Sequence, residues 1–479
     1  MSSFSSLSVA LSSLYAQRRG LDVTGQNIAN ANTEGYSRQR VDLAAIGAPA
    51  VPAMWSTWQG AGGGVTVQGL TSMRDAFLEA RGRDSHSQLA LVNTASQTLN
   101  QVQQLFPEPG PNGLQASLSN LWSGFADLAN RPGDSAARTQ VLQNATGASN
   151  WLNQAHTALA SQWTAIHDQT ITLASEVNTA AQGIADLNQA IQQAVQGGLP
   201  ANEMVDQRDL LAMKLADLVG ATARPGQNGM LDILVGGGSL VLGNVVQTIG
   251  VSAAPVRLEN TNAASQVQLV WTKDNQPLTV SSGQAGAMLN AMNTVLPGYS
   301  TRLDNVAANL ATTVNTQLLA GFDQNGNPGV ALFSSGAAVP PITAENISVA
   351  ITNPALLAAS GVVTPPIPPS VTPVGNLDGS NASKLANFAS LTTGPDAIYR
   401  QLVVDLAVVT QGASRQLDSQ RAITSQIDGA RDSHAGVNID EEMTNMITFQ
   451  RGYEAAARLM TVVDSTLDTL INRTGLVGR

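Results

Sequence analysis

Apolar residues recur at every seventh position in the first thirty and the last forty residues of the 479-residue chain. The N-terminal repeat consists of Leu7, Leu14, Leu21 and Ile28, with Phe4 and Leu11 three residues before two of them. The C-terminal repeat has two registers, Ile439, Met446, Tyr453, Met460 and Leu467, and then Phe449, Ala456, Val463 and Leu470. Such spacing is typical of a coiled-coil seam. The two helices could be core helices of one compact domain. Strict repeats at opposite ends favour a terminal coiled coil, formed within the chain or with neighbouring copies.

Long helices are expected between the two ends. They are predicted at 72–106, 134–196, 282–320 and 396–434, with shorter helices at 202–219 and from 382. The second of these carries its own seam, which includes Leu152, Leu159 and Ile166, and an interruption is considered at Gly147. A break is expected at Pro297 and Gly298, because proline lacks the backbone N–H that a helix interior needs. Long helices need partners along their length, so these segments predict a helical bundle.

Residues 221–281 show a different pattern. Short β-rich segments alternate there with Gly, Asn and Asp turns such as Asn228-Gly229 and Asp274-Asn275. The segments are 221–224, 230–235, 239–242, 245–251, 255–259, 266–272 and 277–280. Residues 334–380 are expected to be irregular, with a short strand at 346–351 and an extended Pro-rich linker at 364–369.

The predicted fold class is therefore mainly α with a β insertion, in three nested domains. Residues 1–35 and 440–479 are expected to form a terminal coiled-coil domain. Residues 36–220 and 282–439 are expected to form the helical bundle, and 221–281 a β-rich outer domain.

Composition excludes several classes of function. The net charge is −10 with only three lysines, so the chain lacks the basic surface that nucleic acids require. Cysteine is absent, which excludes disulfides, thiol nucleophiles and Cys-ligated metals. The sequence has no run of roughly 18 apolar residues, so no membrane insertion is expected. The N-terminus has no cationic segment followed by an apolar one, so we expect no cleaved signal peptide.

Catalytic and metal-binding motifs are also weak. His156 and His167 lie eleven residues apart on one helix, which is not a metal-ligand spacing. The loop that begins at Asp323 resembles a calcium loop only at its start and is interpreted as a tight turn. Asp206, Arg208 and Asp209 form a charged patch, which we interpret as a local ion pair or an interface contact. We therefore predict no enzymatic activity, no cofactor and no metal site.

Both ends resemble a known family. Residues 27–39, Asn-Ile-Ala-Asn-Ala-Asn-Thr-Glu-Gly-Tyr-Ser-Arg-Gln, resemble the N-terminal signature of bacterial flagellar axial proteins, which comprise rod, hook and hook-associated proteins. Residues 436–443, Gly-Val-Asn-Ile-Asp-Glu-Glu-Met, resemble the C-terminal signature of the same family. The form Gly-Tyr-Ser-Arg-Gln at 35–39 resembles the hook-associated members, as do the interior segments 202–210 and 321–327, the latter followed by Leu332-Phe333.

This resemblance implies a structural, non-catalytic role outside the cell. It implies type III export without a cleaved signal, and a ring-like assembly of copies between the hook and the filament. The implied partners are the hook protein, a second hook-associated junction protein and an export chaperone that binds the C-terminal helix, at about 436–479. The alternatives are a distal rod or hook protein, or a secreted adhesin or enzyme whose β domain is the active part.

The heptads predict which residues form the assembly interface. From the N-terminal helix these are Phe4, Leu7, Leu11, Leu14, Leu21 and Ile28. From the C-terminal helix they are Ile439, Met446, Phe449, Tyr453, Met460, Val463, Leu467 and Leu470.

Overall fold

The chain forms two compact units, which we call the terminal unit and the bundle unit. The terminal unit comprises residues 1–88, 177–248 and 421–479, and the bundle unit comprises 89–176 and 249–420. The computed structural model describes residues 3–46, 63–252, 258, 266–336, 341–362 and 377–469, with side chains from Ser6 onward. Within these residues no helix is long and apolar enough to cross a lipid bilayer.

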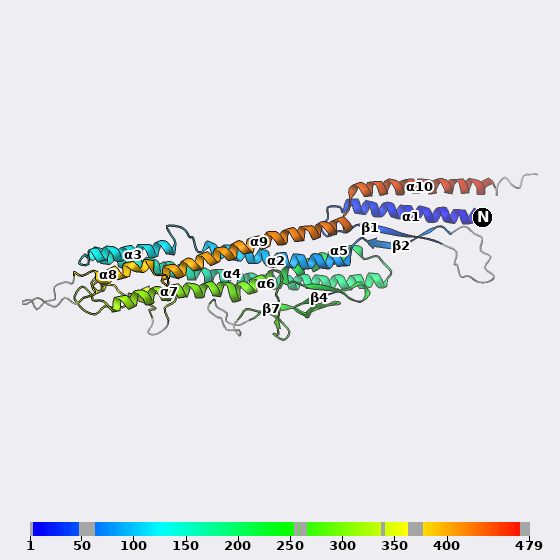
Figure 1. Ribbon diagram of the computed structural model, residues 1–479. Coiled ribbons are helices and arrows are strands. Elements are labelled where there is room, and N and C mark those ends of the chain that lie inside the picture. The colour runs from blue at the N-terminus through cyan, green and yellow to red at the C-terminus, as the bar shows by residue number, and fades with distance from the viewer. Residues whose placement is uncertain are drawn as a thin grey trace, which may run out of the picture. The chain divides into compact units, whose positions relative to one another are not determined.

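Helices dominate both units, and the predicted fold class, mainly α with a β insertion, is confirmed (Figure 1). The long helices are α1 (Ser3–Ala29), α2 (Ala76–Gln104), α4 (Ser135–Gln196), α5 (Asn202–Val219), α7 (Leu296–Leu319), α9 (Pro395–Ala435) and α10 (Ile439–Asp468). The shorter ones are α3 (Leu114–Asn130), α6 (Gly283–Asn290) and α8 (Ser380–Ala386). The division into three nested domains stays a prediction.

The seam predicted for α4 is buried in the folded chain. Leu152, Leu159, Val177 and Ile184 are all fully inaccessible to solvent. The helix runs through Gly147 without the interruption considered from the sequence. It ends at Gln196, and Gly198 then adopts the left-handed conformation that closes a helix.

The bundle unit is built around one hydrophobic core. This core joins α3, the first part of α4, α7 and the first part of α9, through residues such as Leu118, Leu159, Leu310 and Leu402. A three-stranded sheet, β7 (Ile249–Val251), β8 (Leu269–Trp271) and β9 (Pro277–Leu278), belongs to this unit. A two-stranded sheet, β10 (Phe333–Ser334) and β11 (Ser348–Val349), completes it, so a strand is present in the predicted segment 346–351.

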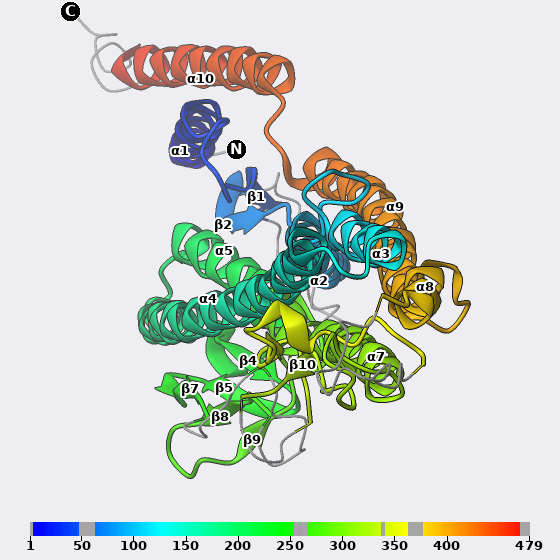
Figure 2. The same cartoon turned by 90° about the vertical axis from the view of Figure 1, so that its left-hand side faces the viewer.

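The terminal unit contains the helix pair, a hairpin and the larger sheet. Strands β1 (Gln39–Ala45) and β2 (Val65–Ser72) pair antiparallel, and α1 lies between this hairpin and α10 in both views (Figures 1 and 2). The larger sheet has the order β3 (Thr222–Pro225), β4 (Leu231–Val235), β5 (Gly238–Leu242) and β6 (Val245–Val246). The side-chain amide of Asn188 in α4 donates to the carbonyl oxygens of Leu231 and Gly243, at 2.8 and 2.6 Å, which ties this sheet to the helix.

The predicted turns are present. Asn228, Gly229 and Asn275 all have positive φ, which explains why Asn and Gly occupy these positions. The Asp323 carboxylate accepts hydrogen bonds from the backbone N–H groups of Asn325 and Asn327, both at 2.8 Å, which is the predicted tight turn. The predicted strand at 255–259, apart from Leu258, and the Pro-rich linker at 364–369 lie outside the described residues.

Two local predictions were wrong, and two elements were not predicted. The helix predicted from 72 begins at Ala76, because Ser72 still pairs with Gln39 and Asp75 caps the helix by accepting from the N–H of Phe77 at 2.8 Å. The break expected at Pro297 lies one turn earlier, as the π-helical turn Ala291–Val295, and the helix continues through the proline. The β1–β2 hairpin and α3 were not predicted. Both elements have a recognisable pattern: apolar and polar residues alternate at 65–67 in β2, and α3 has an apolar stripe from Leu114 to Leu128.

Candidate assembly interface

Helices α1 and α10 pack side by side and antiparallel. Asn27 near the end of α1 contacts Glu442 at the start of α10, whereas Gly20 faces Phe449 and Gln17 faces Gly452. The two terminal helices therefore pack on each other within the chain, and their packing as a coiled coil stays a prediction. A pairing with neighbouring copies stays a prediction.

Glycines mark close approaches between α1 and α10, because Gly20 faces Phe449 and Gly452 faces Gln17. Ala10, Ala16 and Gly20 are buried in α1, and Ala456 and Val463 are buried in α10. A β-carbon added at Gly20 would lie 2.5 Å from Cδ1 of Phe449, so a larger residue there requires the ring or the helix to move. The two helices therefore approach each other closely at these glycines.

The predicted interface residues fall into distinct environments. Val463 is buried, and these residues are partly exposed: Leu7, Leu14, Leu21, Ile28, Met446, Phe449, Met460 and Leu467. Leu11, Ile439 and Tyr453 are exposed, by 42, 50 and 41%. The side chains of Phe4 and Leu470 lie outside the described residues. The assembly role of this set stays a prediction.

Further apolar side chains on the pair also reach solvent. Tyr15 of α1 is 63% exposed, and Met443, Ile447 and Val462 of α10 are 49, 48 and 60% exposed. Monomeric proteins rarely expose apolar residues in contiguous rows, and such rows mark interaction surfaces. The pair thus exposes several apolar side chains, and their use as an interaction surface stays a prediction.

Asn27 is the hub below the helix pair. It is only 1% exposed, and its side-chain amide nitrogen donates to Gln39 O at 2.9 Å and to Glu442 Oε2 at 3.0 Å. Its oxygen accepts from the Tyr36 hydroxyl at 2.8 Å and from the Gln39 N–H at 3.0 Å. The first residue of the N-terminal signature therefore joins α1, the loop after it, β1 and α10.

Arg38 pairs with the start of α10. Its guanidinium donates to Glu442 Oε1 at 2.8 Å and to Glu441 Oε2 at 2.7 Å. Glu442 is only 2% exposed, and burying a carboxylate is costly unless it is paired and hydrogen-bonded. The N-terminal and C-terminal signatures, about four hundred residues apart, thus form one polar cluster.

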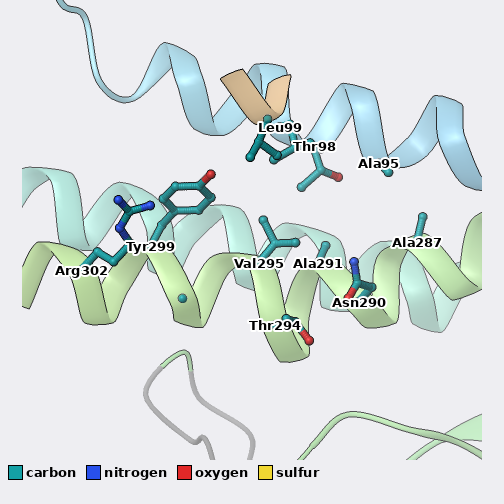
Figure 3. Close-up of a pocket in the computed structure, with 12 residues that line it drawn as sticks. Ala95, Thr98, Leu99, Ala287, Asn290, Ala291, Thr294, Val295, Tyr299 and Arg302 are labelled. Atoms are coloured by element: carbon teal, nitrogen blue, oxygen red, sulfur yellow. The ribbon is translucent and has the colours of Figure 1, made fainter. Parts of the chain in front are cut away.

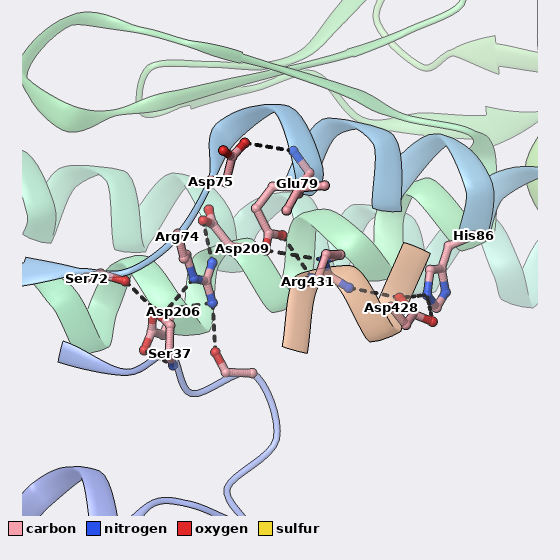
Figure 4. A network of polar contacts seen from close by, with 12 residues as sticks. Ser37, Ser72, Arg74, Asp75, Glu79, His86, Asp206, Asp209, Asp428 and Arg431 are labelled. Carbon is pink, nitrogen blue, oxygen red and sulfur yellow. Dashed lines mark hydrogen bonds and ion pairs between the residues drawn. The ribbon is translucent and has the colours of Figure 1, made fainter. Parts of the chain in front are cut away.

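A second cluster fixes the segment 35–37 to α5 (Figure 4). The Asp206 carboxylate accepts from the Ser37 hydroxyl at 2.6 Å and from its N–H at 3.1 Å. Arg74 donates to Ser37 Oγ at 2.8 Å, to Gly35 O at 2.7 Å and to Asp209 at 2.6 Å. The charged patch identified in the sequence is therefore an anchor, and Arg208 pairs with Asp209 at 3.0 Å as the predicted local ion pair.

Burial changes the acidity of this region. Desolvation raises the pKa of Asp206, against the hydrogen bonds from Ser37 and the charge of Arg74. Burial, together with the negative charges of Asp206, Glu203 and Glu442, raises the pKa of Tyr36 to about 12. The Tyr36 hydroxyl therefore keeps its proton and serves as the donor to Asn27.

A third cluster holds α2, α5 and α9 together within the terminal unit (Figure 4). His86 Nε2 lies 3.1 Å from both oxygens of Asp428, and Nδ1 lies 3.6 Å from Asp217. Arg431 pairs with Glu79 at 2.9 Å and with Asp428 at 3.1 Å. The hydrogen bond to Asp217, then that to Asp428, raises the pKa of His86 above 6.5 despite its partial burial.

Protonated His86 is expected to stabilise the terminal unit. A raised pKa in the folded state means that this stabilisation is complete below the unfolded pKa of about 6.5 and is lost as the pH rises through the folded value. We therefore expect the melting temperature of the terminal unit to fall as the pH rises from below 6.5 through the raised pKa of His86. In His86→Gln this shift should shrink. His167→Gln, in the bundle unit, serves as the control and should leave the shift unchanged.

Elsewhere the described residues offer little that suggests chemistry. A cavity of about 360 Å³ in the bundle unit is lined mostly by small or apolar residues of α2, α6, α7, α9 and the π-helical turn, with Tyr299 and Arg302 at one end (Figure 3). None of its lining residues is a carboxylate, histidine or lysine. His156 is 5% exposed within the bundle, and His167 stacks on Trp163 with ring centroids 5.4 Å apart. No group of three potential metal ligands occurs in the described parts of the chain.

Some of these residues escaped the sequence analysis. Asn27, Arg38 and Glu442 lie inside the quoted signatures, but polar partners that lie far apart in the chain leave no periodic pattern. Gly20 interrupts no heptad position and gave no signal. Arg74 lies outside every motif, and only the fold shows that it meets Ser37 and Asp209.

Comparisons with known proteins agree with this geometry. The family model of the helical domain of flagellar hook-associated protein FlgK matches residues 99–333. The flagella basal body rod protein model matches residues 7–36, and the C-terminal model of the flagellar basal body rod FlgEFG proteins matches 432–473. These two segments contain most of α1 and all of α10, which pack together.

Individual relatives extend the similarity over the whole chain. Flagellar hook-associated protein 1 of Bacillus subtilis is 28% identical over 513 aligned positions, which cover 100% of both chains. The protein of that name from Escherichia coli is 23% identical and covers 97% of this chain and 98% of its own. The flagellar hook junction protein FlgK of Burkholderia pseudomallei has a similar fold, with a TM-score of 0.63 at 17% identity over 74% of this chain and 100% of that one. The terminal models, the helical-domain model and the full-length relatives agree, and the chain therefore belongs to the flagellar hook-associated protein 1 family.

Proposed function

We propose that the chain is the structural subunit that joins the flagellar hook to the filament. Membership in a family of hook-associated proteins indicates that the chain is a structural component of the flagellum. The observation that carries the proposal is the helix pair: both terminal segments matched by rod-protein models pack together, and their outer side exposes apolar residues. A free subunit with such a surface is suited to assembly with neighbours.

The finer picture follows the family. Copies are exported through the type III apparatus without a cleaved signal peptide, and assemble outside the cell into a ring by their terminal helices. The hook protein lies on one side, and hook-associated protein 3, the second junction protein, on the other. An export chaperone binds the C-terminal helix, at about 436–479. The polar clusters of the chain join its own segments to one another, which suits a structural role without catalysis. The match at 99–333 favours this role over a distal rod or hook protein.

Deletion of the gene tests the proposal directly. We expect cells with complete hooks, no filaments, and flagellin lost to the medium. Electron microscopy of the cell surface and immunoblotting of the medium measure both. Intact motile filaments in the deletion strain would refute the junction role.

The seam residues can be tested in the same strain. A chain with Leu14→Asp and Met460→Asp places a charge on each terminal helix, where desolvating it on assembly is costly. We expect it to be exported but not to support filaments. Filaments of normal number would show that the heptads are not an assembly interface.

A further inference from the structure

One face of α10 is exposed in the part of the chain that the structure describes. Ile447, Arg451, Arg458 and Val462 are all exposed, and they follow one another at helical spacings of four, seven and four residues. These spacings place the four side chains on one side of the helix. That side differs from the buried side formed by Glu442, Ala456 and Val463.

The two arginines of this face are not neutralised by the fold. Neither Arg451 nor Arg458 forms an ion pair among the described residues. Glu454 lies between them and leaves the face with a net positive charge. The partner that fits is a surface with excess carboxylates and room for apolar contact.

This chain itself carries such a surface. A groove of about 920 Å³ lies between the loop after α1 and the α9–α10 connection. Four of its lining residues are exposed carboxylates, Glu34, Asp432, Asp440 and Glu441, and its one arginine, Arg38, already pairs with Glu441 and Glu442. Like charges gathered in one groove repel one another, and a cationic partner relieves this.

The two surfaces cannot meet within one molecule. The groove includes Asp440 in the first turn of α10, and Arg451 and Arg458 lie roughly 17 and 27 Å further along the same helix. A contact between different patches on two copies is heterologous and generates rings or helical arrays. We propose that the Arg451–Arg458 face of α10 binds the acidic groove of the next copy. The copies would then be displaced along the helix axis by roughly 17 to 27 Å. This proposal rests on the assembly role proposed above.

Charge exchange provides the first test. One variant carries Glu34→Lys and Asp432→Lys, and the other carries Arg451→Glu and Arg458→Glu. Asp432 lies at the C-terminal end of α9, where lysine suits the helix dipole, so this substitution does not weaken the fold. In the deletion strain each variant is expected to lower the number of filamented cells about tenfold, and their combination to restore it. Glu345→Lys with Asp168→Lys, in the bundle unit, controls for net charge.

Crosslinking tests the contact itself. Because the chain has no cysteine, Asp432→Cys and Arg458→Cys introduce the only thiols. In oxidised, isolated flagella the double variant should give a ladder of linked copies, and neither single variant should do so. No ladder in flagella that assemble normally, or dimers from Arg458→Cys alone, would overturn the heterologous contact and leave the junction role standing. Intact filaments in the gene deletion would remove the junction role itself.

Discussion

Replacement of Asn27 by leucine is expected to loosen the terminal unit more than any other single polar change. Leucine has similar volume but cannot satisfy Glu442, Tyr36 or the backbone of Gln39. A buried group left without its partner costs about 1–3 kcal/mol, and here the buried Glu442 carboxylate is among the groups affected. We expect the local free energy of unfolding to fall by about 3 kcal/mol.

Hydrogen exchange measures this loss where it occurs. The Gln39 amide donates to Asn27, so its protection should fall first, together with that of α1 and α10. Asn32→Leu, at an exposed position of the same signature, should leave protection unchanged. The costs of Asn27→Leu and Glu442→Gln should not add, because the two residues share a hydrogen bond. Unchanged protection at Gln39 in Asn27→Leu would contradict the role of this hub.

Replacement of Gly20 by valine is expected to separate α1 from α10. The added β-carbon would lie 2.5 Å from the Phe449 ring, so the ring or the helix must move. Inserting atoms into a well-packed contact costs about 1–3 kcal/mol. Protection of α10 amides should therefore fall, and junction assembly should fall with it.

The same helix provides a matched control. Gly25 has no atom within 4 Å of its added β-carbon, so Gly25→Ala should stabilise α1 by about 1 kcal/mol through helix propensity. Phe449→Ala combined with Gly20→Val should recover part of the lost protection, because it clears the space that valine needs. If Gly20→Val leaves the protection of α10 amides as high as Gly25→Ala does, α1 and α10 do not pack closely at Gly20.

The sequence predicts the helices well because helical periodicity is a local property. The seam of α4 could be followed over most of its length, and the structure buries it. The hairpin β1–β2 was missed because β1 lies directly after a helix signature and its partner begins only at Val65, beyond a long intervening segment. The break near Pro297 was displaced, because a π-helical turn accommodates the proline without ending the helix.

The apolar residues of the candidate assembly interface could be predicted from the sequence, but its polar contacts could not. Apolar seams repeat along one helix, so Leu14 or Val463 can be recognised from spacing alone. Polar partners have no such period: Asn27 meets Glu442, and Ser37 meets Asp206, only after the chain has folded back on itself.

By itself, the sequence of this protein determined that its ends are seam-bearing helices, that its interior is a bundle of long helices and that it belongs among flagellar axial proteins. Those properties depend on side chains close together in the chain. Only the tertiary structure decided that α1 and α10 pair antiparallel with close approaches at glycines and that the two signatures share one buried polar cluster. It also showed that α10 retains an exposed face. These properties depend on which segments, distant in the sequence, pack against each other and become buried. The order of residues along the chain does not specify those pairings.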